Sequence, residues 1–391
     1  MPVSVFSLML VVFGLTTGEF VIAGILPDVA ADLSVSIPAA GLLVTAYAAG
    51  MIVGGPVVTV LTARAARKPL IAGLIAVSVL GNLGSAAAPN HVVLLLSRFV
   101  AGLVVATFFA VAIATVISMA PAGRQASSVA KVALGMNLGI ILGTPIGTFI
   151  GQHLGWRATF LAVAAFSAVA LLLVLRFVPA QPPATTGSAR GELRVFANRD
   201  LQLAIALTAV GNVGVVTVFT YITPLLTDVG GFAADMVPVL LLGYGAGAVV
   251  GNFAGGRLAD RALMPALAGL LAVLAGVLAA FWLVGGLKAP AVVLTFLIGA
   301  LAFAIIPGMQ TRVVTAAGTA PTLAVAVNAS GFQLAAAFAG WLGGRIIDGG
   351  PGLRAIPLVG ALLTVAGLGI AALLLRRDRR AAAAPADHVP A

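Results

Sequence analysis

The sequence has no cysteine and little charge. Without cysteine the chain can form no disulfide, no thiolate nucleophile and no cysteine-based metal site. Only 8% of its 391 residues are charged, whereas an average soluble domain has about 25%. These proportions exclude a soluble enzyme, a disordered chain and a collagen-like protein. Histidine is equally scarce, because the chain has only His91, His153 and His388. None of the three has a carboxylate partner or the spacing of metal ligands, which argues against a membrane-embedded enzyme.

Long apolar runs fill most of the chain instead. Hydrophobic residues make up 61% of the sequence and the mean hydropathy is +1.17. A helix needs about 20 apolar residues to cross a bilayer, and twelve runs have roughly that length. They lie at about 4–26, 39–62, 70–88, 92–119, 129–152, 159–178, 201–226, 236–256, 263–286, 290–311, 321–344 and 354–375. The pattern predicts an all-α polytopic membrane protein with twelve transmembrane helices. The first run lacks a basic start and exceeds the usual signal-peptide core of about 7–15 residues, so we expect a retained helix.

The basic residues predict how these spans are oriented. Lys and Arg concentrate in cytoplasmic loops of membrane proteins. When both termini are placed in the cytoplasm, only Arg157, Lys288, Arg345 and Arg354 of the 21 basic residues fall outside, and Arg98 lies within a span. We therefore expect a protein of the cytoplasmic membrane with both termini inside. The net charge of +10 is spread over short loops, which argues against nucleic-acid binding.

A polar stretch in the middle divides the chain. Residues 179–200 are rich in Pro, Thr, Ser and Arg, which is typical of a flexible linker. We expect a first six-helix half at 1–178, a cytoplasmic linker at 179–200, a second six-helix half at 201–376 and a cytoplasmic tail at 377–391.

The two halves repeat each other at an offset of 197 residues. The matched pairs are Pro27 and Pro224, Tyr47 and Tyr244, Gly50 and Gly247, Gly54 and Gly251, Arg64 and Arg261, Phe99 and Phe296, Gly102 and Gly299, Gly143 and Gly340, Gly147 and Gly344, Gly155 and Gly352, and Arg157 and Arg354. Six spans per repeat make the halves parallel in the membrane. This is the plan of secondary transporters, which bind substrate between the halves near the midplane.

Two charged residues inside spans break the repeat. Glu19 falls on Val216 and Arg98 falls on Thr295, so symmetric packing cannot require either charge. An apolar surround disfavours an ionised carboxylate, and an ionisable residue inside a membrane is a functional hypothesis by default. We predict that Glu19 carries protons and that Arg98, at a matched depth, controls its charge. The alternatives for Glu19 are a neutral side chain bonded to a neighbouring helix and a side chain that snorkels outward, and the alternative for Arg98 is a bond to helix-end carbonyls.

Further polar and aromatic residues within spans are candidates to line a cavity. They are Thr16, Tyr47, Phe108, Phe109, Asn137, Asn212, Thr217, Phe219, Tyr221, Gln310, Asn328, Phe332 and Gln333. For substrate binding we select Thr16, Tyr47, Phe109, Asn137, Asn212, Phe219, Tyr221, Gln310 and Phe332. Packing is the alternative role for each, and the sequence favours it for any single one. An apolar pocket with a few hydrogen-bonding groups suits an uncharged or amphipathic organic molecule.

The fifth span carries glycine at every fourth position. Gly135, Gly139, Gly143, Gly147 and Gly151 would lie on one helix face, and Pro145 interrupts the backbone hydrogen bonds. Such a face lets another helix approach closely, and the proline allows a bend. By itself this pattern indicates packing.

Several of these motifs resemble the drug:proton antiporter branch of the major facilitator superfamily. The segments TARAARK (62–68) and GGRLADR (255–261) are similar to that family's cytoplasmic-loop motif, Arg98 and Gly102 to its fourth-span proton-relay motif, and the fifth span to its antiporter motif. TTGEFVIAGILP (16–27) is similar to a subgroup that holds chloramphenicol-resistance, sugar and purine exporters, and PLLTDVGGF (224–232) and GGRLADR resemble the chloramphenicol exporters. The chain departs from the family at Ala101, which replaces a usual Gln, and at Thr144, which separates Gly143 from Pro145.

The resemblance implies a function. It implies proton-coupled efflux of a neutral amphipathic drug, chloramphenicol first, by a monomer without cofactor or metal that conducts protons and drug across the bilayer. Roles in gating or packing are implied for Gly139, Gly143, Pro145, Gly147, Asp260 and Arg261. The alternatives are an exporter of a metabolite such as a sugar or purine nucleoside, a membrane enzyme and a channel, and the internal repeat disfavours a channel.

Overall fold

A computed structural model describes residues 2–62, 64–121, 124–181, 198–317 and 321–383. Within these ranges every regular element is helical. The first half holds α1 (Val3–Phe20), α2 (Ile22–Asp32), α3 (Ile37–Leu61), α4 (Arg67–Ala86), α5 (His91–Leu103), α6 (Val105–Met119), α7 (Gln125–Leu138), α8 (Thr144–Leu154) and α9 (Trp156–Phe177). The second half holds α11 (Arg199–Thr220), α12 (Ile222–Pro224), α13 (Val237–Val284), α14 (Lys288–Ala317), α15 (Pro321–Asp348) and α16 (Ile356–Ala383). Short π- or 3₁₀-helical turns occupy Gly139–Gly143, Leu225–Val229, Ala234–Met236 and Leu353–Ala355.

Twelve helical segments match the twelve spans expected from the sequence. Ten helices within the described residues are long and apolar enough to cross a membrane. One of these contains α13, which covers two expected spans and bends at Ala262, where the backbone leaves helical geometry (φ −157°, ψ 82°). The eleventh expected span is α15, which completes the set. The all-α polytopic fold is confirmed.

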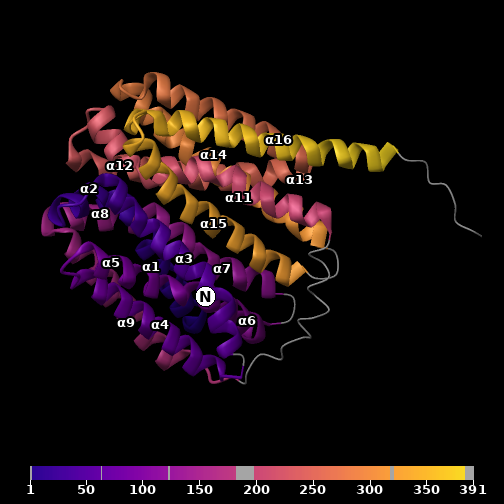
Figure 1. The fold of residues 1–391 in the computed structure, drawn as a ribbon. Coiled ribbons are helices and arrows are strands. Elements are labelled where there is room, and N and C mark those ends of the chain that lie inside the picture. Colours follow the sequence, from indigo (N-terminus) through magenta and orange to yellow (C-terminus); the bar gives the residue numbers. More distant parts are fainter. Residues whose placement is uncertain (1, 63, 122–123, 182–197, 318–320, 384–391) are drawn as a thin grey trace, which may run out of the picture.

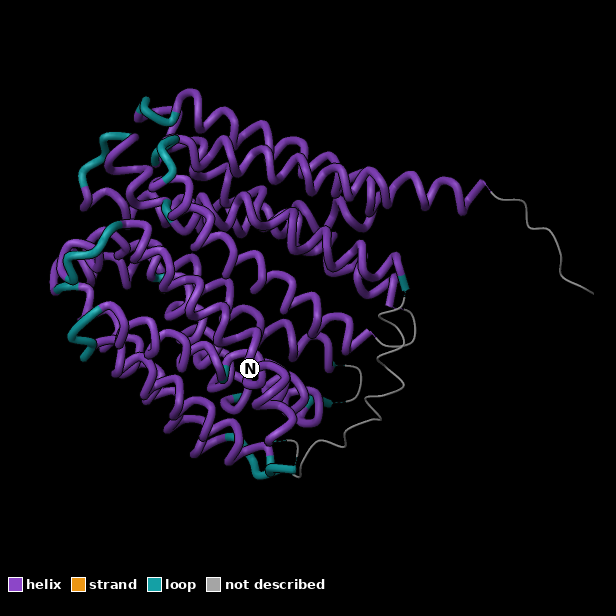
Figure 2. Tube along the Cα trace, viewed as in Figure 1, coloured by secondary structure: helices purple, strands orange, loops and turns teal. Residues whose placement is uncertain are grey.

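The helices run between two ends of the molecule. Loops at 33–36, 87–90, 230–233, 285–287 and 349–352 and the turn at Gly155 gather at one end, here called the distal end (Figure 2). The helix ends that point away from these loops, the end of α16 among them, are here called the terminal end (Figure 1). The expected linker falls mostly on residues 182–197, and the expected tail ends in residues 384–391, so these segments lie outside the described residues.

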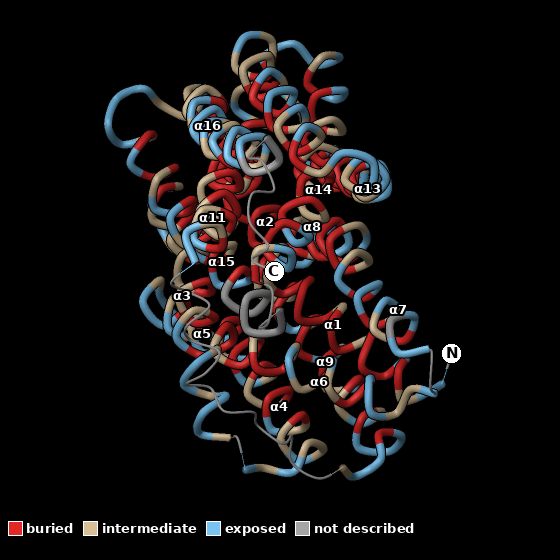
Figure 3. The backbone as a smooth tube through the Cα atoms, turned by 90° about the vertical axis from the view of Figure 1, so that its right-hand side faces the viewer, coloured by how far each residue is buried: buried red, intermediate tan, exposed pale blue. Residues whose placement is uncertain are grey.

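Large apolar side chains cover the outside of the helices. Exposed examples are Leu80, Leu172 and Phe253, while buried residues face neighbouring helices (Figure 3). A soluble protein rarely exposes an apolar surface of this extent, and hydrocarbon is the solvent that matches it. The chain is a multi-pass membrane protein.

The first and second halves lie side by side, lower and upper in Figure 1, with α15 between them. Helix α15 contacts α3, because Thr45 Oγ1 donates a hydrogen bond of 2.7 Å to the Ala337 carbonyl. Gln152 Nε2 donates across the halves to the Ala234 carbonyl over 2.6 Å. Both bonds lie toward the distal end, so the halves are joined there.

A carbonyl left free by a proline accepts another hydrogen bond between the halves. Pro27 has no N–H, so the Ala23 carbonyl, four residues earlier, receives no helical hydrogen bond from it. Thr223 Oγ1, from the second half, donates to that carbonyl over 2.7 Å. The carbonyl that Pro27 leaves without a helical partner therefore accepts its hydrogen bond from the opposite half.

The internal repeat is reproduced in individual contacts. In the first half α3 crosses α5, and in the second half the part of α13 before Ala262 crosses α14, so closely that a Cβ on a glycine would collide with backbone of the neighbour. The pairs are Gly50 with Phe99 and Gly247 with Phe296, Gly54 with Leu103 and Gly251 with Ala300, and Gly102 with Tyr47 and Gly299 with Tyr244. Every contact recurs 197 residues later, so the repeat records a helix crossing that only glycine permits.

Candidate functional site

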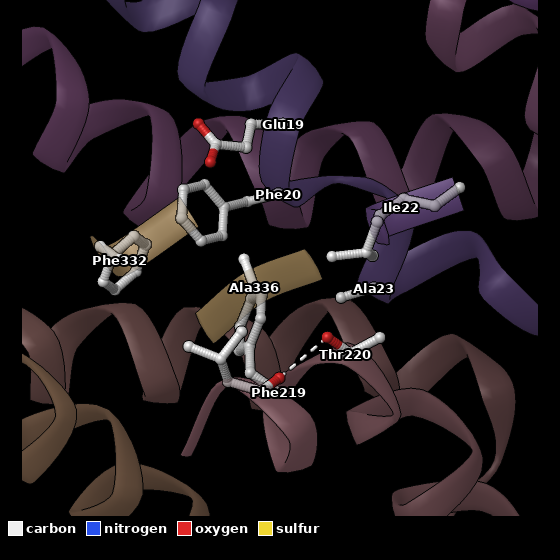
Figure 4. A pocket seen from close by; sticks show the side chains of 10 residues that line it. Glu19, Phe20, Ile22, Ala23, Phe219, Thr220, Phe332 and Ala336 are labelled. Carbon is white, nitrogen blue, oxygen red and sulfur yellow. Dashed lines mark hydrogen bonds between the residues drawn. The ribbon is translucent and has the colours of Figure 1, made fainter. Parts of the chain in front are cut away.

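Glu19 lies in the last turn of α1, just before the helix is interrupted at Val21. The side chain is half-buried and lines a pocket with an empty volume of about 340 Å³, open solvent included. Phe20, Val44, Phe219, Thr220 and Phe332 are among the other lining residues. Glu19 and Phe20 extend from α1 toward the segment of α15 that carries Phe332 (Figure 4). The pocket therefore lies between the two halves, and Glu19 is its only charged lining residue.

A second pocket, with an empty volume of about 360 Å³ that also includes open solvent, adjoins the first. The two share Phe20, Val216, Phe219 and Phe332 as a common wall. The second pocket is completed by Asn212, Val215, Tyr244, Ala302, Phe303 and Ile306. The shared wall is held by ring contacts, with the Phe20 and Phe219 centroids 5.8 Å apart and those of Phe219 and Tyr244 4.7 Å apart. Both pockets are mainly apolar, which suits an amphipathic organic molecule.

Glu19 has a hydrogen-bond partner in the second half. Gln333 Nε2, on α15, lies 3.1 Å from Glu19 Oε1, and the amide is the donor because a carboxylate only accepts. The sequence left open a Glu19 bonded to a neighbouring helix, and α15 is that helix.

Arg98 is completely buried without a hydrogen bond. Its three guanidinium nitrogens have no partner among the described residues. The guanidinium carbon lies 4.4 Å from the centre of the Tyr47 ring and 5.4 Å from that of Phe160, and such cation–π contacts contribute about 2 kcal/mol when desolvated. Arg98 thus does not bond helix-end carbonyls, the packing role considered from the sequence. It also forms no ion pair with Glu19 in the described part of the chain.

Three of the nine residues selected for substrate binding line these pockets. They are Asn212, Phe219 and Phe332. Asn212 Nδ2 donates to the Thr208 carbonyl over 2.7 Å and to the Met309 sulfur over 3.3 Å.

The other six residues lie elsewhere. Tyr47 packs under Arg98, and Tyr221 donates to the Gly340 carbonyl over 2.7 Å. Thr16 lies against Gly139. Phe109 packs against Phe108, while Asn137 is half-buried and Gln310 is exposed. None of these six lines either described pocket.

Sequence reasoning missed Phe20 and Tyr244 as lining residues. Both had a signal. Phe20 follows Glu19 directly, and Tyr244 is the repeat counterpart of Tyr47. Position 295, the counterpart of Arg98, is a threonine whose hydroxyl donates to the Ala291 carbonyl of its own helix. Tyr244 lines the second pocket, and among the described residues no cation lies over its ring.

The glycines of the fifth span contact α1 and α2 at every step. The pairs are Gly135 with Met9, Gly139 with Phe13, Gly143 with Thr17, Gly147 with Val21, and Gly151 with Ile25. Each step of four residues on one helix matches a step of four on the other, as in two parallel helices in close contact. The backbone at Gly139–Gly143 is π-helical, and this turn ends two residues before Pro145. This interface fixes the helix that carries Glu19. Asp260 and Arg261 are exposed on α13 at the terminal end, next to the bend at Ala262.

A polar cluster ties the first half together at the distal end. Asp32 accepts hydrogen bonds from Arg157 and from Trp156 Nε1, and Arg157 also donates to the Ala88 carbonyl. These donors, Arg157 first, hold the pKa of Asp32 below its ordinary value.

Comparisons with known proteins agree with this architecture. The sequence model of the Major Facilitator Superfamily matches residues 8–322. The chain is 36% identical to the uncharacterized MFS-type transporter YfhI of Bacillus subtilis, over 93% of this chain and 92% of that protein. It is 34% identical to the inner membrane transport protein YdhP of Escherichia coli, over 92% of each chain. It is 35% identical to a chloramphenicol resistance protein of Streptomyces lividans, over 86% of this chain and 87% of that protein.

Solved structures agree in fold. A bacterial homolog of the human lysosomal transporter Spinster, inward-facing and unoccupied, superposes with a TM-score of 0.78 at 16% identity, covering 95% of this chain and 96% of that one. A D-xylose–proton symporter superposes with a TM-score of 0.71 at 17% identity, covering 94% and 96%.

Proposed function

Because the chain belongs to the Major Facilitator Superfamily and is a transporter rather than an enzyme, we propose that it exchanges protons for an amphipathic drug. The drug moves outward across the cytoplasmic membrane and the proton moves inward. The observation that carries this proposal is Glu19, the one charged side chain in an otherwise apolar pocket between the halves.

The chemistry of the pocket favours an uncharged amphipathic substrate. Phenyl rings of Phe20, Phe219 and Phe332 offer flat apolar surface, and Asn212 offers a hydrogen-bonding amide. No lysine or arginine lines either pocket, so an anion would have no counter-charge. Chloramphenicol is the leading candidate, because a relative at 35% identity is named a chloramphenicol resistance protein.

Protons supply the free energy. With the distal end facing outward, as the basic residues indicate, Glu19 takes up a proton from outside and releases it to the cytoplasm. Each proton moved inward gains about 2.3 kcal/mol per 100 mV of membrane potential. A pH difference adds about 1.4 kcal/mol per unit. One proton per drug molecule thus supports a drug gradient of tens to hundreds fold.

The test is the accumulation of labelled chloramphenicol in efflux-deficient cells. We expect wild type to lower accumulation and Glu19→Gln, at matched expression, not to. Glu192→Gln is the matched control, because Glu192 is the chain's other glutamate and lies in the expected linker. Collapse of both membrane potential and pH difference should abolish the wild-type effect.

Other outcomes would contradict the proposal in distinct ways. If Glu19→Gln still lowers accumulation, export stands and Glu19 is not the proton carrier. If wild type has no effect, chloramphenicol is not the substrate, and competition with sugars and purine nucleosides tests the metabolite alternative.

A further inference from the structure

Gln333 connects the second half of the protein to Glu19. Its side chain is buried on α15, and its amide donates to the Glu19 carboxylate on α1 over 3.1 Å. The Oε1 atom of Gln333 is buried without a partner among the described residues, so the amide is oriented by this single bond. A movement that separates α15 from α1 must break it.

Along α15, this bond lies further from the distal end than the hydrogen bond that joins Ala337 to Thr45. Toward the distal end, α15 contacts α3 through Gly344 against Pro38 and through Ala337, whose carbonyl accepts from Thr45. Gln333 lies one turn further from the distal end than Ala337, and Ser330, almost one more turn away, is exposed. Glu19 and Gln333 therefore meet further from the distal end than the contacts of Ala337 and Gly344 with α3.

The strength of this bond depends on the charge of Glu19. A hydrogen bond to an ionised carboxylate is about twice as strong as one between neutral groups, so a proton on Glu19 weakens it. The titratable groups that interact electrostatically with Glu19 are Arg98 on α5 and Tyr47 on α3. Both belong to the first half and move with Glu19, whereas Gln333 belongs to the second half.

We propose that Gln333 is a positioning residue that holds the empty, ionised transporter closed at the distal end. This inference rests on the proposed proton exchange. An exchanger that changed its open side while carrying neither proton nor drug would leak protons without moving drug. Protonation of Glu19 weakens the bond to Gln333, and a substrate that enters beside the adjacent Phe332 displaces the amide. Each event frees the halves to move, and the empty ionised state stays locked.

Gln333→Met tests the lock, because methionine has similar length and no N–H donor. Purified protein in liposomes with an internal pH dye is given an inward-directed pH gradient without drug. We expect drug-independent proton flux on the order of ten- to a hundredfold above wild type, as loss of a hydrogen bond to a charged group implies. Exchange of labelled for unlabelled chloramphenicol at equal concentrations should persist, which shows that the variant is folded. Gln125→Met, at an exposed glutamine that begins α7, is the matched control and should not leak.

Wild-type proton flux in Gln333→Met would overturn the proposal while leaving the proposed function intact. Failure of the proposed function is seen separately, as wild-type transport that ignores the proton gradient.

A second measurement does not depend on transport by the variant. The chain has no cysteine, so Gln152→Cys with Ala234→Cys places two spin labels across the distal interface. In the wild-type background, raising the pH should shift the distance distribution toward the short, closed population. Gln333→Met should remove this pH dependence, and a variant that keeps the wild-type pH dependence would refute the lock.

Discussion

The glycine crossings can be tested with four alanine variants that differ only in what the new methyl group meets. A Cβ at Gly50 would collide with the carbonyl oxygen of Phe99, and its repeat counterpart Gly247 would collide with that of Phe296. Gly73 on α4 and Gly276 on α13 have no atom within 4 Å of the same position. Gly50 and Gly73 therefore compare a tight site with an open site in the first half, and Gly247 and Gly276 do the same in the second half.

The expected change in folding stability has opposite signs at the tight and the open sites. Alanine is favoured over glycine inside a helix by about 0.5–1 kcal/mol, so Gly73→Ala and Gly276→Ala should be neutral or stabilising. At Gly50 and Gly247 the obstacle is backbone, which cannot rotate away, and overpacking of this kind costs about 1–3 kcal/mol. Subtracting the helix preference leaves a net loss of about 1–2 kcal/mol.

Thermal unfolding of the purified variants in detergent measures the difference. We expect lower midpoints for Gly50→Ala and Gly247→Ala, by similar amounts, and unchanged or higher midpoints for the two open sites. Equal midpoints for Gly50→Ala and Gly73→Ala would refute the argument that glycine is required by the helix crossing.

Two further predictions concern charged groups. Arg98→Met should unfold at or above the wild-type thermal midpoint, because it removes a buried cation without hydrogen bonds among the described residues. The same variant should lose proton-driven drug efflux. A clearly lower midpoint would show that Arg98 is structural. Asp32 has its pKa lowered by Arg157 and Trp156, so its stabilising contribution is present above about pH 4 and is lost as the pH falls through the folded-state pKa. Wild type should therefore lose more stability than Asp32→Asn on acidification below that pH in thermal melts, and parallel losses would contradict the assignment.

Periodicity located the spans well because each has to bury its backbone in lipid by itself. The differences lie at span ends. Residues 257–262 were expected to separate two spans, but α13 continues helically through them and turns only at Ala262. The first expected span ends at 26, whereas α2 extends to Asp32. Polar residues can prolong a helix beyond the apolar core of the membrane, so hydropathy alone does not mark where the helix ends.

The sequence by itself determined the class of protein, the number of spans, the repeat and the two charged residues that break it. These properties can be read from composition and spacing, because each segment that crosses the lipid has to satisfy its own backbone polar groups. Only the tertiary structure decided which residues meet. Gln333 and Glu19 are 314 positions apart, and no local pattern connects them. Likewise, Asn212 lines a pocket while Tyr221 bonds a carbonyl, although both are polar residues in the same expected span. Which face of a helix meets substrate depends on how the two halves pack, and that packing arises from long-range contacts rather than from the local sequence.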